Sequence, residues 1–251
     1  MTLTENSARR ARVKASLFVA AACLLGLFTT GESASSAPTN SISTAMVTSV
    51  GYPKAGVILS TRLAAHAKPS RSSSTVKVFP QFRSDFRPTT LLVLGQTRAA
   101  KGIRWLKISV PMRPNGRTGW VKAASVETRP VHRSVVIDLS ARKLRVLERG
   151  KTRFATRVAI GRRGMETPTG SYYITASFKP TERFLGTFAF ETSAYSKLSE
   201  WPGGGVVGLH GTSMPSLLGQ AVSHGCVRMS NAAARVLKRL TPAGTPVRIV
   251  P

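Results

Sequence analysis

Two glycine-flanked segments near the C-terminus constrain this chain more than any other feature. One runs Leu209-His210-Gly211-Thr212, and the other runs Ser223-His224-Gly225-Cys226-Val227-Arg228. A cysteine becomes a strong nucleophile when a nearby histidine, especially a charged one, raises its thiolate fraction. Neighbouring glycines permit tight turns and leave backbone N–H groups free to face an oxyanion. The pattern therefore favours a thiol nucleophile, and the alternative is a small buried cysteine beside two hydrogen-bonded histidines.

The first residues have the layout of an export signal. Basic residues between Arg9 and Lys14 precede an apolar run over residues 15–28, and small residues follow up to Ala37. This is the three-part plan of a secretory signal, and the run is shorter than the about 20 residues that a membrane-spanning helix needs. We expect residues 1–37 to be a signal peptide, with an uncleaved anchor as the alternative, and residues 38–54 to be a flexible lead-in. The protein is then exported.

Removal of that signal leaves Cys226 as the only cysteine of the chain. An exported protein with one cysteine has no internal disulfide, so its thiol is either a nucleophile or a liability. A lone cysteine also leaves too few ligands for a zinc site, and we expect no metal and no cofactor.

The charge balance is strongly basic, with 37 Lys and Arg against 10 Asp and Glu and a net charge of +27. Such a charge fits nucleic-acid binding, attraction to an anionic envelope, or simple solubility. The basic residues are scattered, and no nucleic-acid motif accompanies them. Together with the export signal, this favours the anionic cell envelope as partner over nucleic acid.

Residues 55–128 predict a small β domain. Short β-prone runs alternate with turn residues, and Arg113-Pro114-Asn115-Gly116 predicts a hairpin turn in which Asn-Gly supplies positive φ. Even spacing of short strands predicts a barrel. Trp105 and Trp120 are either its core or exposed aromatics that hold a ligand, and we expect His66 in a polar loop without a role. The predicted strands are 57–59, 75–79, 91–94, 105–110 and 118–121.

Residues 131–251 predict a second β domain, joined to the first at residues 127–130. Ser230 or Asn231 can cap one helix over residues 232–240, which Pro242 ends. The sum is a mostly-β sandwich with one short helix. The predicted strands are 134–140, 143–148, 154–160, 171–178, 203–209 and 245–250.

The two C-terminal segments together resemble the active-site motif of the YkuD family of L,D-transpeptidases, bacterial cell-wall enzymes with a catalytic cysteine. The resemblance spans about residues 133–251 and includes Thr167-Pro168-Thr169-Gly170, which in the family precedes a strand that borders the active-site cleft. Residues 55–128 resemble bacterial SH3-like modules, which often accompany cell-wall enzymes. The implied fold is an SH3-like barrel followed by a β-sandwich catalytic domain.

The resemblance implies roles for several residues. Cys226 is the nucleophile, and His210 is the base, whose ring is oriented by the carbonyl of Gly211. We expect the backbone N–H groups of Gly225 and Cys226 to donate to the oxyanion.

Three further side chains are candidates from their spacing. His224 stands two residues before Cys226 and either lines the cleft or fixes the loop through a hydrogen bond. Arg228 can hold a substrate carboxylate through a bidentate pair. Ser223 either binds substrate or stabilises the turn.

The implied reaction is acyl transfer on the tetrapeptide stems of peptidoglycan. Cys226 attacks the carbonyl of the diamino acid at position three and expels D-alanine. The acyl-enzyme then passes to an amine of another stem, which links two diamino acids. With water as acceptor the protein is an L,D-carboxypeptidase, and a β-lactam such as a carbapenem is the expected covalent inhibitor.

Two alternatives belong to other classes. One is a catalytically idle wall-binding protein in which the SH3-like module does the work, and the intact pair of His210 and Cys226 argues against it. The other is a nucleic-acid binder, which rests on charge alone. For the transpeptidase the expected location is the bacterial cell envelope, in the periplasm or otherwise outside the cytoplasmic membrane.

Overall fold

The computed structural model describes residues 47, 49–51, 53–200 and 204–251. The expected signal peptide and most of the expected lead-in lie outside these residues. The chain divides into two units, Met1–Ile42 and Ser43–Pro251, and every described residue belongs to the second. No helix within the described part of the chain is long and apolar enough to cross a membrane.

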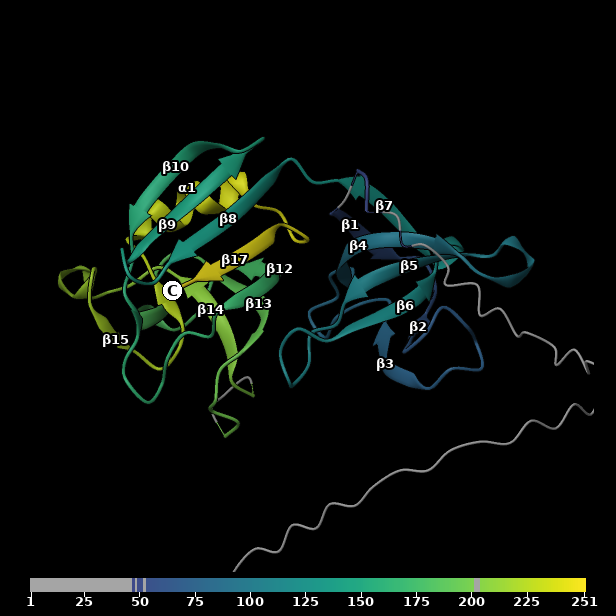
Figure 1. Cartoon of the computed structure of the whole chain (residues 1–251). Helices are drawn as coiled ribbons and strands as arrows, with labels where there is room; N and C mark the ends of the chain where they lie inside the picture. Colours follow the sequence, from purple (N-terminus) through teal and green to yellow (C-terminus); the bar gives the residue numbers. More distant parts are fainter. Residues whose placement is uncertain (1–46, 48, 52, 201–203) are drawn as a thin grey trace, which may run out of the picture. The chain divides into compact units, whose positions relative to one another are not determined.

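The first half of the described chain forms one seven-stranded sheet (Figure 1). Its strand order is β3-β2-β6-β5-β4-β1-β7, and the paired strands run antiparallel. Turn residues separate the strands as expected, and Gly116 has φ of 84° in the turn before β6. The strands are β1 (Lys54–Ile58), β2 (Arg62–His66), β3 (Thr75–Pro80), β4 (Thr90–Arg98), β5 (Arg104–Ser109), β6 (Thr118–Lys122) and β7 (Val126–Pro130).

Two of these strands were not predicted. In β7 only Val126 is buried, so the strand lacks the alternating apolar pattern, and residues 127–130 looked like a join between domains. The residues of β7 instead pair with β1 along its whole length.

The other strand that was not predicted is β2. His66 is its last residue rather than part of a loop, and the His66 Nδ1–H donates to the Ser73 carbonyl at 3.0 Å. The expected loop position of His66 was therefore wrong.

Trp105 and Trp120 are core residues of this sheet. Their side chains are 2% and 9% exposed, respectively. The Trp105 ring also meets the His66 ring edge-on, with 5.8 Å between the ring centroids. The alternative in which these tryptophans form an exposed aromatic surface is therefore excluded.

The second half forms a curled, eight-stranded mixed sheet in the order β10-β9-β8-β17-β12-β13-β14-β16. The N-terminal part of β12 pairs with β17 and its C-terminal part pairs with β13, so this one strand joins both halves of the expected sandwich. A small sheet of β11 and β15 lies beside it. The strands are β8 (Arg133–Asp138), β9 (Lys143–Glu148), β10 (Lys151–Arg157), β11 (Ile160–Gly161), β12 (Gly170–Phe178), β13 (Ala189–Tyr195), β14 (Val206–His210), β15 (Ala221–Ser223), β16 (Val227–Arg228) and β17 (Pro246–Val250).

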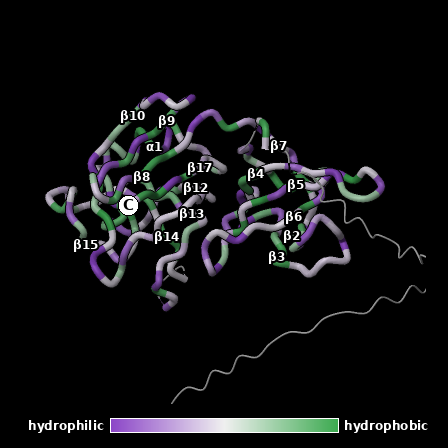
Figure 2. Tube along the Cα trace, in the orientation of Figure 1, coloured by the Kyte–Doolittle hydropathy of each residue, from purple (hydrophilic) through white to green (hydrophobic). Residues whose placement is uncertain are grey.

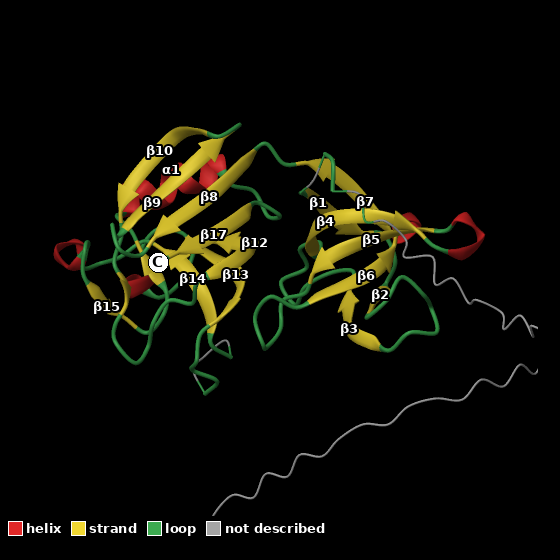
Figure 3. Ribbon diagram, in the orientation of Figure 1, coloured by secondary structure: helices red, strands yellow, loops and turns green. Residues whose placement is uncertain are grey.

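Strands dominate both halves (Figure 3). The described part of the chain contains one α-helix and four short 3-10 helices. This confirms the mostly-β class with a single helix. The predicted strand 154–160 is displaced, because β10 ends at Arg157 and the chain then leaves β9, so that Ile160 pairs with Ala221 of β15. Hydrophobic positions recur along strands such as β8 and β9 (Figure 2).

Helix α1 (Asn231–Leu240) covers one face of the mixed sheet. Ser230 is its N-cap and accepts a hydrogen bond from Ala233 N at 3.1 Å, as the sequence predicted. Ala233, Ala234 and Leu237 are buried in the same hydrophobic core as the strands. The helix therefore begins directly after the Cys226 segment and fixes that segment against the core.

Replacing Leu237 tests this anchoring. Its side chain is fully buried, so Leu237→Ala leaves a cavity and should lower the free energy of unfolding by about 2–5 kcal/mol. Arg239→Ala, on the exposed face of the same helix, should change it by about 0.5 kcal/mol or less. Urea unfolding of both variants measures the difference, and equal effects would show that α1 is not held by its apolar face.

Candidate active site

The pairing of β14 with β16 brings His210 and Cys226 together from distant points in the sequence. The two strands run parallel, with His210 opposite Arg228, and Cys226 stands directly before β16. The Gly208 N–H donates to the Cys226 Sγ at 3.3 Å. Because side chains alternate along a strand, Leu209 enters the core and His210 lies on the same face as Gly208. That face carries the candidate site.

Gly208 keeps the space between the thiol and the imidazole open. A Cβ at this position would lie 3.7 Å from the Cys226 Sγ and 4.0 Å from the His210 Cδ2. Gly208 was not among the residues predicted from the sequence to form the site. The available signal was a glycine inside an otherwise apolar strand, which often marks a close approach of other groups.

The tautomer of His210 follows from its hydrogen bond. Its Nδ1 lies 2.6 Å from the carbonyl oxygen of Gly211. A carbonyl only accepts, so Nδ1 carries the proton and Nε2 keeps a lone pair. The Nε2 atom is therefore ready to take a proton from the thiol. This carbonyl stands where many cysteine and serine enzymes use a carboxylate.

Both members of the pair are neutral at pH 7. Burial lowers the pKa of His210 to about 4, and the Arg228 cation adds to this effect while the Gly211 hydrogen bond opposes it. Burial raises the pKa of the Cys226 thiol, against the Gly208 N–H and Arg228, which lower it. A neutral His210 agrees with its predicted role as a base, but it supplies no positive charge that would raise the thiolate fraction of Cys226.

Gly211 is locked in place by close packing. A Cβ here would collide with the Asn231 Oδ1, which accepts a hydrogen bond from Thr187 N at 3.0 Å. The Gly211 N–H donates to the Phe188 carbonyl at 3.0 Å. Asn231, considered only as a helix cap, thus helps to fix the carbonyl that orients His210.

Ser223 builds the turn that leads to Cys226. Its hydroxyl donates to the Cys226 carbonyl at 2.5 Å and accepts from the Gly225 N–H at 3.1 Å, and its side chain is fully buried. Of the two expected roles, this geometry supports the turn over substrate contact. It also engages the Gly225 N–H, so this group is not free to donate to an oxyanion as expected. The Cys226 N–H remains a prediction for that role.

Thr167 supports the same turn from the other side. Its hydroxyl donates to the Gly225 carbonyl and accepts from the Gly161 N–H, both at 2.9 Å, and it is 3% exposed. Gly225 has φ of 115°, which favours glycine. The loop that carries Thr167 was predicted from the sequence, but no role was predicted for this residue.

A cavity of about 70 Å³ opens at the pair. Arg228 is one of its lining residues, and its buried Nε has no hydrogen-bond partner among the described residues, which fits the predicted contact with a substrate carboxylate. The His224 Nε2 lies 3.3 Å from the Arg162 guanidinium, so this histidine is tied to the neighbouring loop as well as to the cavity wall. The lining residues are Phe184, Leu185, Ser196, Gly205, Val206, Val207, His210, Ser223, His224, Cys226 and Arg228.

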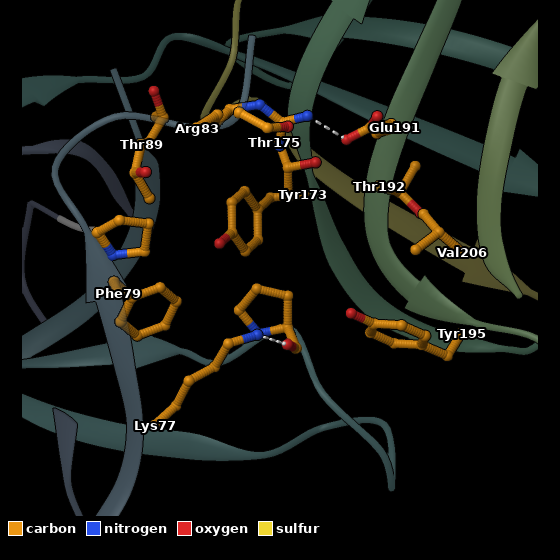
Figure 4. Close-up of a pocket in the computed structure, with 14 residues that line it drawn as sticks. Lys77, Phe79, Arg83, Thr89, Tyr173, Thr175, Glu191, Thr192, Tyr195 and Val206 are labelled. Atoms are coloured by element: carbon orange, nitrogen blue, oxygen red, sulfur yellow. Dashed lines mark hydrogen bonds and ion pairs between the residues drawn. The ribbon is translucent and has the colours of Figure 1, made fainter. Parts of the chain in front are cut away.

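A second cavity of about 290 Å³ shares Val206 with the first (Figure 4). Lys77, from the first sheet, donates to the Pro111 carbonyl at its edge at 2.5 Å. Arg83 and Glu191 form an ion pair across it at 2.6 Å. Side chains of both sheets therefore line this cavity.

Within the described ranges, no group of three or more His, Cys, Asp or Glu side chains is placed to hold a metal ion.

Comparison with known proteins assigns the domain that carries this site. Residues 132–249 match the model of the YkuD L,D-transpeptidase catalytic domain. The YkuD protein of Bacillus licheniformis is 33% identical over 117 residues, which is 47% of this chain and 65% of that protein. The YkuD protein of Bacillus subtilis is 29% identical over 122 residues, 49% of this chain and 67% of that protein.

Solved structures of L,D-transpeptidases are also similar to this chain. L,D-transpeptidase 3 from Mycobacterium tuberculosis, in complex with a faropenem-derived adduct, has a TM-score of 0.44 at 13% identity and covers 65% of this chain and 91% of its own. The L,D-transpeptidase LdtMt1 in complex with imipenem has a TM-score of 0.42 at 16% identity, with 59% and 90% covered.

Filling the gap at Gly208 tests the pairing of thiol and imidazole. In Gly208→Ala the new methyl meets its neighbours at ordinary contact distances, so the fold should persist. It stands beside both reacting groups, however, and should slow modification of Cys226 by iodoacetamide at pH 7 by about 10-fold to 100-fold. As a control for folding, the melting temperature of Gly208→Ala should stay near that of the wild type. An unchanged labelling rate would show that this space is not used.

Acid should destabilise the domain through His210. An unfolded histidine titrates near 6.5, and here the folded pKa is lowered to about 4. Between these values the unfolded chain binds a proton that the folded chain does not, so stability should fall as the pH falls, by up to about 3 kcal/mol at pH 4. His210→Gln should lose this part of the pH dependence. His132 is exposed, so the control variant His132→Gln should retain it. If the melting temperatures of the wild type and His210→Gln fell by the same amount between pH 7 and pH 4.5, this prediction would be contradicted.

Proposed function

We propose that the protein is a cysteine-dependent L,D-transpeptidase acting on peptidoglycan tetrapeptide stems. The observation that carries the proposal is the arrangement of Cys226 and His210 in a YkuD-family domain, with the His210 Nε2 free to act as a base. The donor is a stem whose third residue is a diamino acid followed by D-alanine. The product is a cross-link between two diamino acids.

The neutral resting pair defines the first step. As the Cys226 Sγ forms a bond to the carbonyl carbon of the diamino acid, its proton moves to the His210 Nε2. The Cys226 N–H donates to the developing oxyanion. The imidazolium then protonates the leaving amine. Free D-alanine departs, and the stem remains bound to Cys226 as a thioester. Burial favours neutral His210, so the proton is readily passed on.

The second step returns the site to its starting state. The amine of a second stem attacks the thioester carbonyl, and the His210 Nε2 takes its proton. Collapse of this intermediate breaks the C–S bond and leaves the peptide cross-link. The His210 imidazolium then returns its proton to the released thiolate of Cys226. Water in place of the amine gives hydrolysis, so the acceptor distinguishes a transpeptidase from an L,D-carboxypeptidase.

Arg228 is the proposed contact for the substrate carboxylate. Its side chain lines the cavity, and its buried Nε has no hydrogen-bond partner among the described residues. A carboxylate placed there would satisfy this donor. The positive charge also lowers the pKa of Cys226, so Arg228 assists both binding and attack.

The N-terminal sheet is proposed to be an SH3-like module, and the protein is proposed to act outside the cytoplasmic membrane. The export-type sequence of residues 1–37 and the net charge of +27 support attraction to the anionic cell envelope. A role in peptidoglycan biosynthesis and cell shape follows from the proposed reaction.

Intact-protein mass spectrometry tests the nucleophile. Residues 38–251 incubated with a carbapenem should gain the mass of one inhibitor, and Cys226→Ala should gain none while keeping the wild-type melting temperature. Folded wild-type protein without an adduct would reject the proposal in favour of an idle wall-binding protein.

The natural reaction is tested with a disaccharide tetrapeptide. The wild type should release D-alanine and give a cross-linked dimer, whereas hydrolysed tripeptide alone would assign a carboxypeptidase. Arg228→Gln should raise KM at least tenfold by removing the carboxylate contact. An unchanged KM would remove Arg228 from substrate binding.

A further inference from the structure

The connection between β13 and β14 forms one wall of the Cys226 cavity. Tyr195 and Val206 are the last paired residues of the two strands. Ser196, Gly205 and Val206 line the cavity, and the Ser196 N–H donates to the Gly205 carbonyl at 2.8 Å. The position of this connection therefore shapes the space in front of the thiol.

A loop of the first sheet holds this connection. Arg113 lies between β5 and β6, and its guanidinium donates to the carbonyls of Gly204 at 2.9 Å, Ser196 at 3.0 Å and Leu198 at 3.1 Å. A planar guanidinium carries five N–H donors and can serve several acceptors at once. All three acceptors here belong to the β13–β14 connection.

Asn115, from the same loop, binds both backbone groups of Tyr195. Its Nδ2 donates to the Tyr195 carbonyl at 2.8 Å, and the Tyr195 N–H donates to its Oδ1 at 3.0 Å. The Arg113 guanidinium also lies 4.7 Å from the centre of the Tyr195 ring. Tyr195 and Val206 together line the larger cavity (Figure 4). Arg113 and Asn115, which we call the clamp, thus grip the connection at its base.

Two glycines show how closely the clamp is linked to the nucleophile. A Cβ at Gly205 would collide with the Leu198 carbonyl and the Arg113 guanidinium. A Cβ at Gly225 would lie 3.0 Å from the Ser196 Cβ. Contacts therefore run without a break from Arg113 through Ser196 to the turn that ends at Cys226.

We propose that Arg113 and Asn115 are positioning residues for the Cys226 site, so that the N-terminal sheet completes the active site in addition to any role in wall binding. The consequence for rate rests on the function proposed above. The clamp itself rests on the hydrogen bonds and can be tested without any reaction.

The rate test compares acylation by a carbapenem in four proteins. Arg113→Ala removes three hydrogen bonds to the β13–β14 connection and should lower the second-order acylation rate by about 10-fold to 100-fold, since small misplacements near reacting groups are costly. In Arg113→Lys, one ammonium group replaces the planar guanidinium, so the acylation rate should lie between the rates of Arg113→Ala and the wild type. Arg117→Ala, an exposed arginine of the same loop outside the clamp, should keep the wild-type rate.

Hydrogen exchange gives a readout that needs no catalysis. In Arg113→Ala and Asn115→Ala, amides of residues 195–200 and 223–226 should exchange faster, while the core strands β8 and β9 should exchange at the wild-type rate. Faster exchange across the whole mixed sheet would show a general stabilising contact and would overturn the proposal.

The outcomes separate the two proposals. A wild type that forms no adduct rejects the proposed function, and the exchange measurement still decides whether the clamp holds the cavity wall. Wild-type acylation and unchanged exchange in Arg113→Ala would reject the clamp and leave the proposed function standing.

Discussion

The parallel pairing of β14 with β16 is the interaction on which the site depends. Leu209 and Val227 are buried in the core at this pairing, and His210 lies opposite Arg228. Cys226 is thereby placed beside Gly208, which lies on the same face of β14 as His210. The short β16 is held further by α1, which starts directly after it and buries Leu237 in the same core. Hydrophobic burial thus sets the geometry of a polar site.

Burial also decides how the site can work. A buried imidazole and a buried thiol both favour their neutral forms, and the nearby Arg228 does not reverse this for the thiol. In the reaction that we propose, the thiol proton therefore moves to His210 as the sulfur attacks the carbonyl carbon. A neutral, buried thiol is also less reactive than an exposed thiolate.

The first sheet is more than a separate module attached to a catalytic domain. Its β5–β6 loop reaches the β13–β14 connection through Arg113 and Asn115, and Arg83 pairs with Glu191 of β13. Because both contacts end on strands or loops that border the cavities, the two sheets share the task of shaping the surface around Cys226. This arrangement gives the N-terminal sheet a direct influence on the reaction that we propose.

The sequence alone determined the mostly-β class, the single helix with its Ser230 cap, and the segments that carry Cys226 and His210, because these depend on local periodicity, capping and motif spacing. It missed β7, whose residues 127–130 lack an apolar pattern, and it did not find Gly208, Thr167 or Asn231. Only the tertiary structure decided which backbone groups meet at the thiol and that His210 is neutral. The roles of these residues depend on contacts between segments far apart in the chain, and the charge of His210 depends on the burial those contacts create.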